Sequence, residues 1–197
     1  MQTRHFTLGI ALLMLTGVIG SAEAKTQHVH CQGSGSFADG VETNIDTNGD
    51  GVSAVVDQGL VNCSIGRFFF QEETEWIFQP TVTTCPAGTT YEFHIDATQG
   101  QHRSIAIDEK TTDQIFGQVI LGTLCYNAST LTYTSTSHTK IIGGTGKYTG
   151  ATGTFDGHAS SSYLQFGFKG GTGAFGGFGQ FTLANDGTFT LPNDKEE

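Results

Sequence analysis

Positive charge is scarce in this sequence. Its 197 residues include 9 Lys and Arg against 19 Asp and Glu, which gives a formal net charge of -10 at pH 7. Nucleic acids and anionic membrane surfaces are bound through clustered cations, so we expect neither as a partner. Long apolar runs are scarce as well. After residue 24, no segment approaches the roughly 20 apolar residues of a membrane-spanning helix, and we expect no membrane span.

Helical patterns are also nearly absent. Windows with apolar residues at helical spacing are interrupted by Gly or by β-branched clusters. Stretches rich in aromatic and β-branched residues, such as 64–70, 90–96 and 115–126, predict β-strands instead. Clusters of Gly, Asn and Asp separate roughly ten such stretches, a spacing typical of one antiparallel barrel or sandwich. The sequence therefore predicts an all-β fold.

The first residues have the pattern of a secretory signal peptide. Within 1–24, Arg4 supplies positive charge, residues 6–20 are apolar, and a small-x-small site ends the segment. This pattern predicts export, to the extracellular space or the periplasm. The remaining residues, 25–197, are expected to form one β-barrel domain with a frayed, solvated C-terminal tail.

The chain has four cysteines, and none of them forms a C-x-x-C pair. That lack argues against a zinc knuckle or a thioredoxin-type site, and an even count in an exported chain favours two disulfides. Three pairings are open. Cys31 and Cys63 lie symmetrically about the turn-like segment 46–51, so a hairpin closed there would make them face each other. This favours Cys31–Cys63 together with Cys85–Cys125.

The stretch IIGGTGKYTGATGTF, residues 141–155, has the look of a phosphate-binding loop. A P-loop needs glycine five residues before the Gly146-Lys147 pair and Ser or Thr after it, but Ile141 and Tyr148 stand there. The residues that follow predict a strand rather than the helix whose N-terminus would meet a phosphate. We therefore interpret the stretch as a glycine-rich turn between two strands.

The same stretch resembles the turn-and-strand signature G-G-T-G-[KR]-[FY]-x-x-A-x-G of the allene oxide cyclase/dirigent barrel superfamily. The matching residues are Gly143, Gly144, Thr145, Gly146, Lys147, Tyr148, Ala151 and Gly153. The resemblance implies a single antiparallel barrel of eight strands, or nearly so, with a largely apolar cavity. It also implies a homo-oligomer, a trimer or a dimer. Gly143, Gly144, Gly146 and Gly150 are expected to form its structural turn.

The function that the resemblance implies is that of a secreted, dirigent-like barrel. Such a barrel binds a small apolar or phenolic ligand and guides its coupling without catalysing the oxidation. We thus expect a binding protein rather than an enzyme. The alternative is a cyclase or isomerase that acts on a reactive apolar intermediate in the barrel lumen. Fold similarity alone does not decide between the two.

A calcium site is the candidate for a cofactor. In the segment 45–57, oxygen ligands recur at the spacing of a calcium loop, with glycine at the sixth position. The ligands would be Asp46, Asn48, Asp50, Val52 and Asp57. Helices do not flank the segment, as they do in an EF-hand, and the same residues also suit a plain hairpin turn. A structural or surface protein that calcium rigidifies is therefore a third functional hypothesis.

Acid–base chemistry in the lumen would need the polar face of strand 90–96 to point inward. The candidate catalytic residues are Glu92, His94, Asp96 and Arg103. If that face points to solvent, these residues are ordinary outward side chains of a half-buried strand.

His28 and His30 share one face of another strand, but two ligands alone make a weak metal site.

Overall fold

The computed structural model describes residues 24–38, 54–96, 102–169 and 174–192. Its elements are β1 (Lys25–Ala38), β2 (Val55–Cys63), β3 (Gly66–Thr74), β4 (Ile77–Gln79), β5 (Tyr91–Asp96), β6 (Arg103–Asp108), β7 (Gln114–Asn127), β8 (Thr132–Gly144), the 3₁₀ turn η1 (Gly146–Tyr148), β9 (Thr152–Lys169) and β10 (Ala174–Leu191). Within these residues, no helix could cross a membrane.

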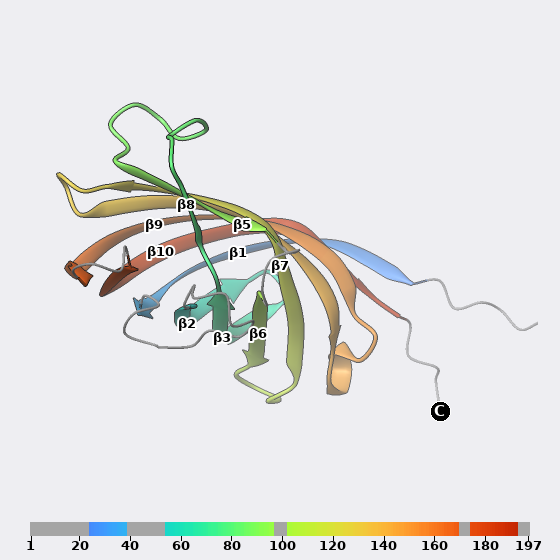
Figure 1. Cartoon of the computed structure of the whole chain (residues 1–197). Coiled ribbons are helices and arrows are strands. Elements are labelled where there is room, and N and C mark those ends of the chain that lie inside the picture. Colours follow the sequence, from blue (N-terminus) through green and yellow to red (C-terminus); the bar gives the residue numbers. More distant parts are fainter. Residues whose placement is uncertain (1–23, 39–53, 97–101, 170–173, 193–197) are drawn as a thin grey trace, which may run out of the picture.

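Eight of the strands close into an antiparallel barrel, which confirms the predicted fold class (Figure 1). Around the wall the order is β7, β6, β3, β2, β1, β10, β9 and β8, and pairing between β7 and β8 closes the circle. Every pairing is antiparallel, as an up-and-down meander requires. Membership of the allene oxide cyclase/dirigent superfamily stays a prediction.

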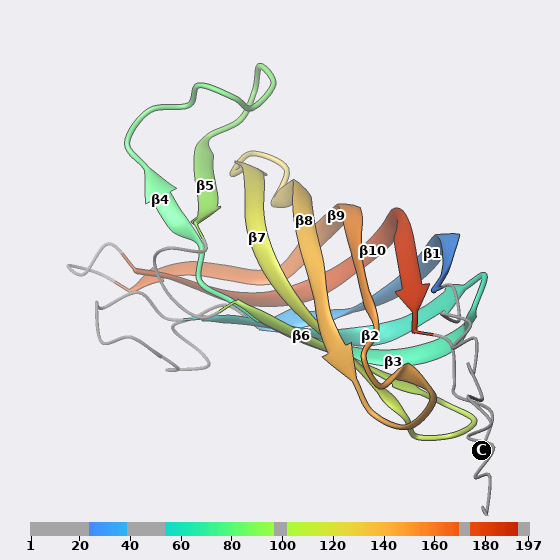
Figure 2. The same cartoon turned by 90° about the vertical axis from the view of Figure 1, so that its right-hand side faces the viewer.

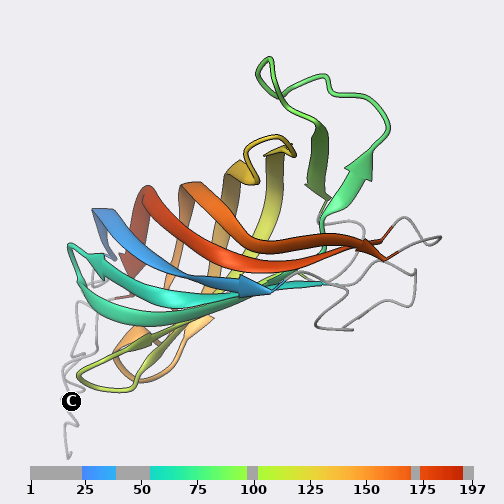
Figure 3. The same ribbon diagram turned by 90° about the vertical axis from the view of Figure 1, so that its left-hand side faces the viewer.

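The β4–β5 hairpin lies outside the closed circle. One edge of β7 is shared, because its first residues pair with β6 and residues 121–126 pair with β5. The hairpin and the segment that joins its strands project from the barrel (Figure 2 and Figure 3). The pairing of β6 with β7 stops at Gln118, and β5 therefore pairs with residues 121–126 along the same edge.

Apolar side chains fill the barrel from both ends. One cluster of buried residues surrounds Phe68, Tyr148 and Phe189, and a second surrounds Phe37 and Phe181. Strand alternation explains this, since every second residue of a barrel strand points inward. In β7 the burial pattern alternates over residues 114–119 in this way. A cavity lies between the two clusters, in the middle of the barrel.

Glycine allows close approach where β1 meets β2. Gly35 and Gly59 are directly opposite in the register. A Cβ atom on Gly35 would lie 2.0 Å from the Gln58 carbonyl oxygen and 2.7 Å from Cζ of Phe181. Because no side chain would fit there, Gly35 lets the ring of Phe181 lie against the barrel wall, and Gly59 lets the backbone of β1 approach closely.

The two disulfides join the predicted pairs. Cys31 and Cys63 are direct cross-strand partners in the β1–β2 hairpin and form a bond of 1.99 Å. Cys85 and Cys125 form a bond of 2.00 Å, which ties the segment between β4 and β5 to β7. The first bridge therefore fixes a hairpin of the barrel wall, and the second fixes the projecting segment.

The glycine-rich turn closes one end of the barrel. Gly146 has a φ of +52°, a conformation that favours glycine. Next to it, the side chains of Lys147 and Tyr148 reach back to the carboxylate of Asp108 at the end of β6. Lys147 Nζ donates to Asp108 Oδ2 over 2.7 Å, and the Tyr148 hydroxyl donates to the same oxygen over 2.8 Å. Tyr148 is buried against the rings of Phe68 and Phe189.

Asp108 is the common acceptor of this end of the barrel. Its other oxygen accepts the backbone N–H groups of Lys110 and Thr111. The Lys147 ammonium, chiefly, and then the hydrogen bonds from Lys110, Tyr148 and Thr111 outweigh desolvation and hold the pKa of Asp108 well below its usual range. The lysine and tyrosine of the signature are thus structural here, which agrees with interpreting the stretch as a turn.

We predict that Asp108→Ala lowers the free energy of unfolding by about 2–4 kcal/mol, because it leaves a partly buried ammonium and a buried hydroxyl without their acceptor. Urea unfolding at pH 7 with the disulfides intact measures the change. Glu109→Ala is the matched control, because Glu109 meets Arg67 at 3.4 Å on the exposed surface. Its change should stay within about 0.5 kcal/mol. Equal effects of the two substitutions would contradict this role of Asp108.

Candidate functional site

A cavity of about 160 Å³ lies in the lumen between the two apolar clusters. Aromatic and aliphatic side chains form most of its wall, among them Phe68, Phe70, Trp76, Phe155, Phe181 and Leu183. An engineered apolar cavity of about 150 Å³ in another protein stays dry and binds benzene. The lumen therefore has the size and the lining to hold a molecule of about one ring.

Two carboxylic acids interrupt this apolar wall. Asp57 on β2 and Glu72 on β3 are direct cross-strand partners, and both line the cavity. Directly opposed residues of an antiparallel pair have Cβ atoms about 4.5–5.5 Å apart. Neutral polar groups, including Ser135 and Asn185, lie on other strands of the wall. We refer to Asp57 and Glu72 together as the lumenal acid pair.

Glu72 is held in a desolvated environment. Burial raises the pKa of its carboxyl group from 4.5 to about 7. The Glu72 side chain is half-buried and lines the same cavity as Phe70 and Trp76. Close to neutral pH the group is therefore present in both its protonated and its ionised form. A carboxyl group in that state can both donate and accept a proton.

Asp57 was expected at the last position of a calcium loop. The structure places it on β2, opposite Phe37 of β1 on one side and Glu72 of β3 on the other. The other expected ligands, Asp46, Asn48, Asp50 and Val52, lie outside the described residues. Calcium binding by that segment therefore stays a prediction.

The sequence-predicted pair Glu92 and His94 lies on the other side of β5 from the lumen. Neither residue lines the cavity. His94 Nε2 lies 2.7 Å from Glu92 Oε1, so the structure does bring the two together. The opposite face of β5 carries Tyr91 and Phe93, which pack against the second apolar cluster. The polar face therefore does not supply acid–base groups to the lumen.

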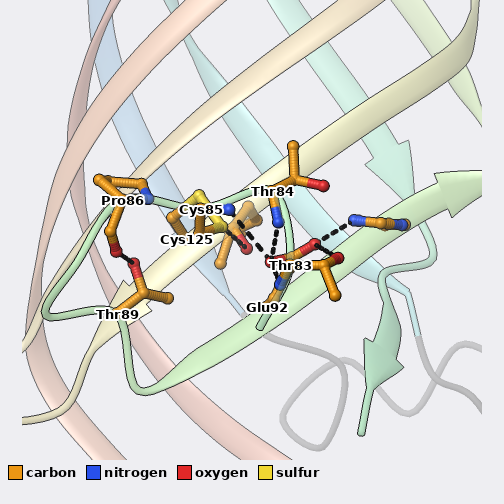
Figure 4. Close-up of a disulfide and its surroundings, with 9 residues drawn as sticks. Thr83, Thr84, Cys85, Pro86, Thr89, Glu92 and Cys125 are labelled. Atoms are coloured by element: carbon orange, nitrogen blue, oxygen red, sulfur yellow. Dashed lines mark hydrogen bonds and ion pairs between the residues drawn. A yellow bond between two sulfur atoms is a disulfide. The ribbon is translucent and has the colours of Figure 1, made fainter. Parts of the chain in front are cut away.

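Glu92 instead fastens the segment between β4 and β5. Its Oε2 accepts the backbone N–H groups of Thr83, Thr84 and Cys85 at 2.9, 3.0 and 3.2 Å (Figure 4). Desolvation alone would raise the pKa of Glu92, but these three bonds and the one to His94 together lower it to about 2. With the adjacent disulfide, this buried carboxylate explains how a segment without regular structure is held in place.

The remaining sequence candidates, Arg103 and Asp96, lie apart from each other, and the nearby His102 has a structural contact. Arg103 begins β6 and is exposed, with Glu73 as its cross-strand partner. Asp96 ends β5 opposite Leu121, and its side chain is not among the described ones. His102 is buried, and its Nδ1 accepts the backbone N–H of Glu75 over 3.1 Å. Of these residues, Arg103 and His102 have described side chains, and neither lines the lumenal cavity.

Sequence reasoning missed the lumenal acid pair. The stretch RFFFQEET, residues 67–74 of β3, alternates so that Phe68, Phe70 and Glu72 share one face. That alternation was readable, but Phe69 makes the opposite face aromatic as well. Which face points inward was decided by barrel closure, and Phe69 is exposed on the outside. A strand with aromatic residues on both faces gives no sign of its orientation from sequence alone.

No protein-family model, curated protein or solved structure matches this chain.

We predict that stability falls as the pH rises from about 4.5 to 7. Over this interval the unfolded chain has already released the Glu72 proton and the folded chain still holds it. The loss of unfolding free energy is complete above pH 7. The rise in the pKa of Glu72 from 4.5 to about 7 corresponds to a loss of about 3 kcal/mol. Glu72→Gln should remove this contribution and unfold at higher urea concentration than the unsubstituted protein at pH 8.

Urea unfolding of both proteins at pH 5 and pH 8 measures this effect. Glu109→Gln serves as the control, because Glu109 is an exposed residue that pairs only with Arg67 across the surface. The control should follow the pH dependence of the unsubstituted protein. If Glu72→Gln also follows it, the carboxyl group of Glu72 is not desolvated in the folded state.

Proposed function

We propose that this protein is a secreted barrel that binds a small, largely apolar or phenolic molecule in its lumen. The single observation that carries the proposal is the cavity of about 160 Å³ with an apolar wall and one pair of acids. Ligand sites in proteins are mostly apolar, with a few polar groups that fix the orientation of the ligand. The lumen of this barrel has that composition.

The acid pair would fix the orientation of the ligand in the lumen. A hydroxyl group directed at Asp57 or Glu72 would donate a hydrogen bond inside an apolar cavity. Such a bond is worth more there than at the surface, because water does not compete for it. A phenol therefore suits the lumen better than a hydrocarbon ring of the same size. An anion does not, since it would meet two acids.

Two further features support export of the protein. Both disulfides are formed and the described chain has no free cysteine, as expected in an oxidising compartment. The apolar N-terminal segment of the sequence has the pattern of a signal peptide. An exported barrel that holds a phenolic ligand is suited to guiding the coupling of that ligand, as dirigent proteins do.

A second candidate function is proton transfer in the lumen, by an isomerase or a cyclase. The observation that favours it is the direct opposition of Asp57 and Glu72 within an apolar wall. A desolvated carboxylate is a stronger base than one in water, and a carboxyl group that titrates near neutrality is suited to general acid–base catalysis. Glu72 would take a proton from one carbon of the bound molecule and return it to another, without a cofactor.

We predict that phenol binds in the lumen more tightly than benzene. Trp76 is the only tryptophan of the chain and lines the cavity, so its fluorescence, excited at 295 nm, reports occupancy. Ala159→Leu, which fills the lumen from β9, should weaken phenol binding about tenfold or more, equivalent to 1.4 kcal/mol. Ser160→Leu is the matched control, because Ser160 is the next residue and is exposed.

Thermal unfolding of both variants confirms that each is folded before binding is measured. Native mass spectrometry of the protein purified from its source adds an independent measurement, since a retained ligand appears as extra mass. Absence of a fluorescence change with either compound at millimolar concentration would refute binding in the lumen. Equal loss of binding in both variants would show that the compound binds elsewhere.

The proton-transfer function predicts turnover of 3-cyclohexenone in the lumen. This single-ring ketone becomes 2-cyclohexenone when a base moves one proton, and the conjugated product is followed by its absorbance. The rate should rise as the pH passes about 7, where Glu72 ionises, and Glu72→Gln should lower it about 100-fold or more. Glu109→Gln should leave it unchanged. A rate equal to that in buffer, or one that Glu72→Gln does not alter, excludes this function for the acid pair.

A further inference from the structure

Three side chains with metal-binding atoms meet on the outer surface of the barrel. They are His28 and His30 of β1 and Asp186 of β10, and their candidate ligand atoms all lie within 4.8 Å of one another. All three residues are exposed. Within the described residues, no other group of three His, Cys, Asp or Glu side chains comes as close together. We refer to these three residues as the seam triad, because β1 and β10 are the first and last strands of the barrel.

The fold explains why the triad forms. His28 and His30 are two residues apart on β1, so strand alternation places both on the outer face, and their ring centroids lie 4.9 Å apart. The register pairs His30 directly with Asp186, whose Oδ1 contacts His30 Nδ1. Figure 3 shows β1 and β10 side by side along the wall. Sequence alone offered only the two histidines, because Asp186 lies at the other end of the chain.

We propose that the seam triad binds a divalent transition-metal ion such as Cu²⁺ or Zn²⁺. Two imidazole nitrogens and one carboxylate oxygen are a donor set that these ions accept, and water completes the coordination. This site is separate from the lumen and does not depend on the ligand proposed there. It is also separate from the calcium loop predicted in the sequence, which would use oxygen ligands alone.

The geometry of the triad suits such an ion. Bonds of about 2.0–2.1 Å to a tetrahedral ion place the ligand atoms roughly 3.3 Å apart. The side chains of His30 and Asp186 are 69% and 58% exposed, so they are free to adjust to this spacing without disturbing the core. The ion would take the place between His30 and Asp186 that their direct contact now occupies.

The electrostatic surroundings also favour a cation. Asp156 of β9 is the cross-strand neighbour of Asp186 on the same outer face, which brings a second carboxylate beside the triad. Asp156 itself pairs with His138, whose Nδ1 lies 2.6 Å from Asp156 Oδ1. The net charge of the whole chain is -10, so cations are attracted at long range as well.

A bound ion would join the two strands whose pairing closes the barrel at the ends of the chain. The unfolded chain does not hold residues 28, 30 and 186 together, so the ion binds the folded state preferentially. Binding of that kind stabilises the fold in proportion to the logarithm of the metal concentration. The structural role of the ion would thus be to fasten the β1–β10 seam, which has no disulfide of its own among the described residues.

The test uses residues 25–197, which include every described element, without an affinity tag and after treatment with chelator. Isothermal titration with Cu²⁺, Zn²⁺ and Ca²⁺ should show one site for each of the first two ions, tighter for Cu²⁺. Zn²⁺ at 100 times its Kd should raise the thermal midpoint by about 5–10 °C. His28→Ala, His30→Ala and Asp186→Asn should each weaken binding about tenfold or more. None of them should alter any response to Ca²⁺, which prefers oxygen ligands.

His138→Ala is the matched control, because it removes an outer-face histidine from a His–Asp pair without touching the triad. It should leave the affinity for Zn²⁺ and Cu²⁺ unchanged. Asp186→Asn distinguishes a site made by the fold from one made by the N-terminal segment alone. If Asp186→Asn binds as tightly as the unsubstituted protein, or if His138→Ala weakens binding as much as the triad variants do, the proposal is wrong. Absence of binding at millimolar Zn²⁺ and Cu²⁺ also overturns it.

Discussion

Closure of the sheet is the constraint on which the rest of this structure depends. Pairing of β7 with β8 and of β1 with β10 leaves the barrel wall without a free edge. Once the wall is closed, alternate residues of each strand must lie either in the lumen or on the outside. The lumenal cavity, its acid pair and the outer seam triad are all consequences of this division. The end of the barrel is then held by Asp108, which accepts the side chains of Lys147 and Tyr148.

Three carboxyl groups show how closure and burial give one functional group different roles. Asp108 and Glu92 are buried but accept several hydrogen bonds, so their pKa values are lowered and both act as fixed structural anions. Glu72 faces the lumen, where desolvation raises its pKa to about 7. The difference is the supply of donors: the Lys147 ammonium, chiefly, stabilises the Asp108 carboxylate, and backbone N–H groups stabilise that of Glu92. Of these three carboxyl groups, Glu72 is the one whose pKa lies near neutrality and which lines the lumenal cavity.

Much of the architecture was predictable. Alternation and turn residues indicated an all-β barrel, and the symmetry of Cys31 and Cys63 about one turn indicated their pairing, because opposed residues of a hairpin are equidistant from its turn. The candidate site was predicted less well. Glu92 and His94 are together, as expected, but on the outer side of β5 beneath the segment that contains Cys85. A polar face can be buried by a segment outside the barrel, and strand periodicity carries no information about such a cover.

The sequence by itself indicated the class of fold, favoured the two disulfide pairs that form, and indicated the glycine-rich turn that follows β8 at Gly144. These depend on local chemistry: side-chain alternation, glycine at positive φ and cysteines that flank one hairpin. The tertiary structure alone decided which face of each strand is inside. It thereby placed Asp57 opposite Glu72 in an apolar lumen, and Asp186 beside His28 and His30 on the outside. Those groupings depend on the register between strands and on closure of the whole circle, which no local pattern encodes.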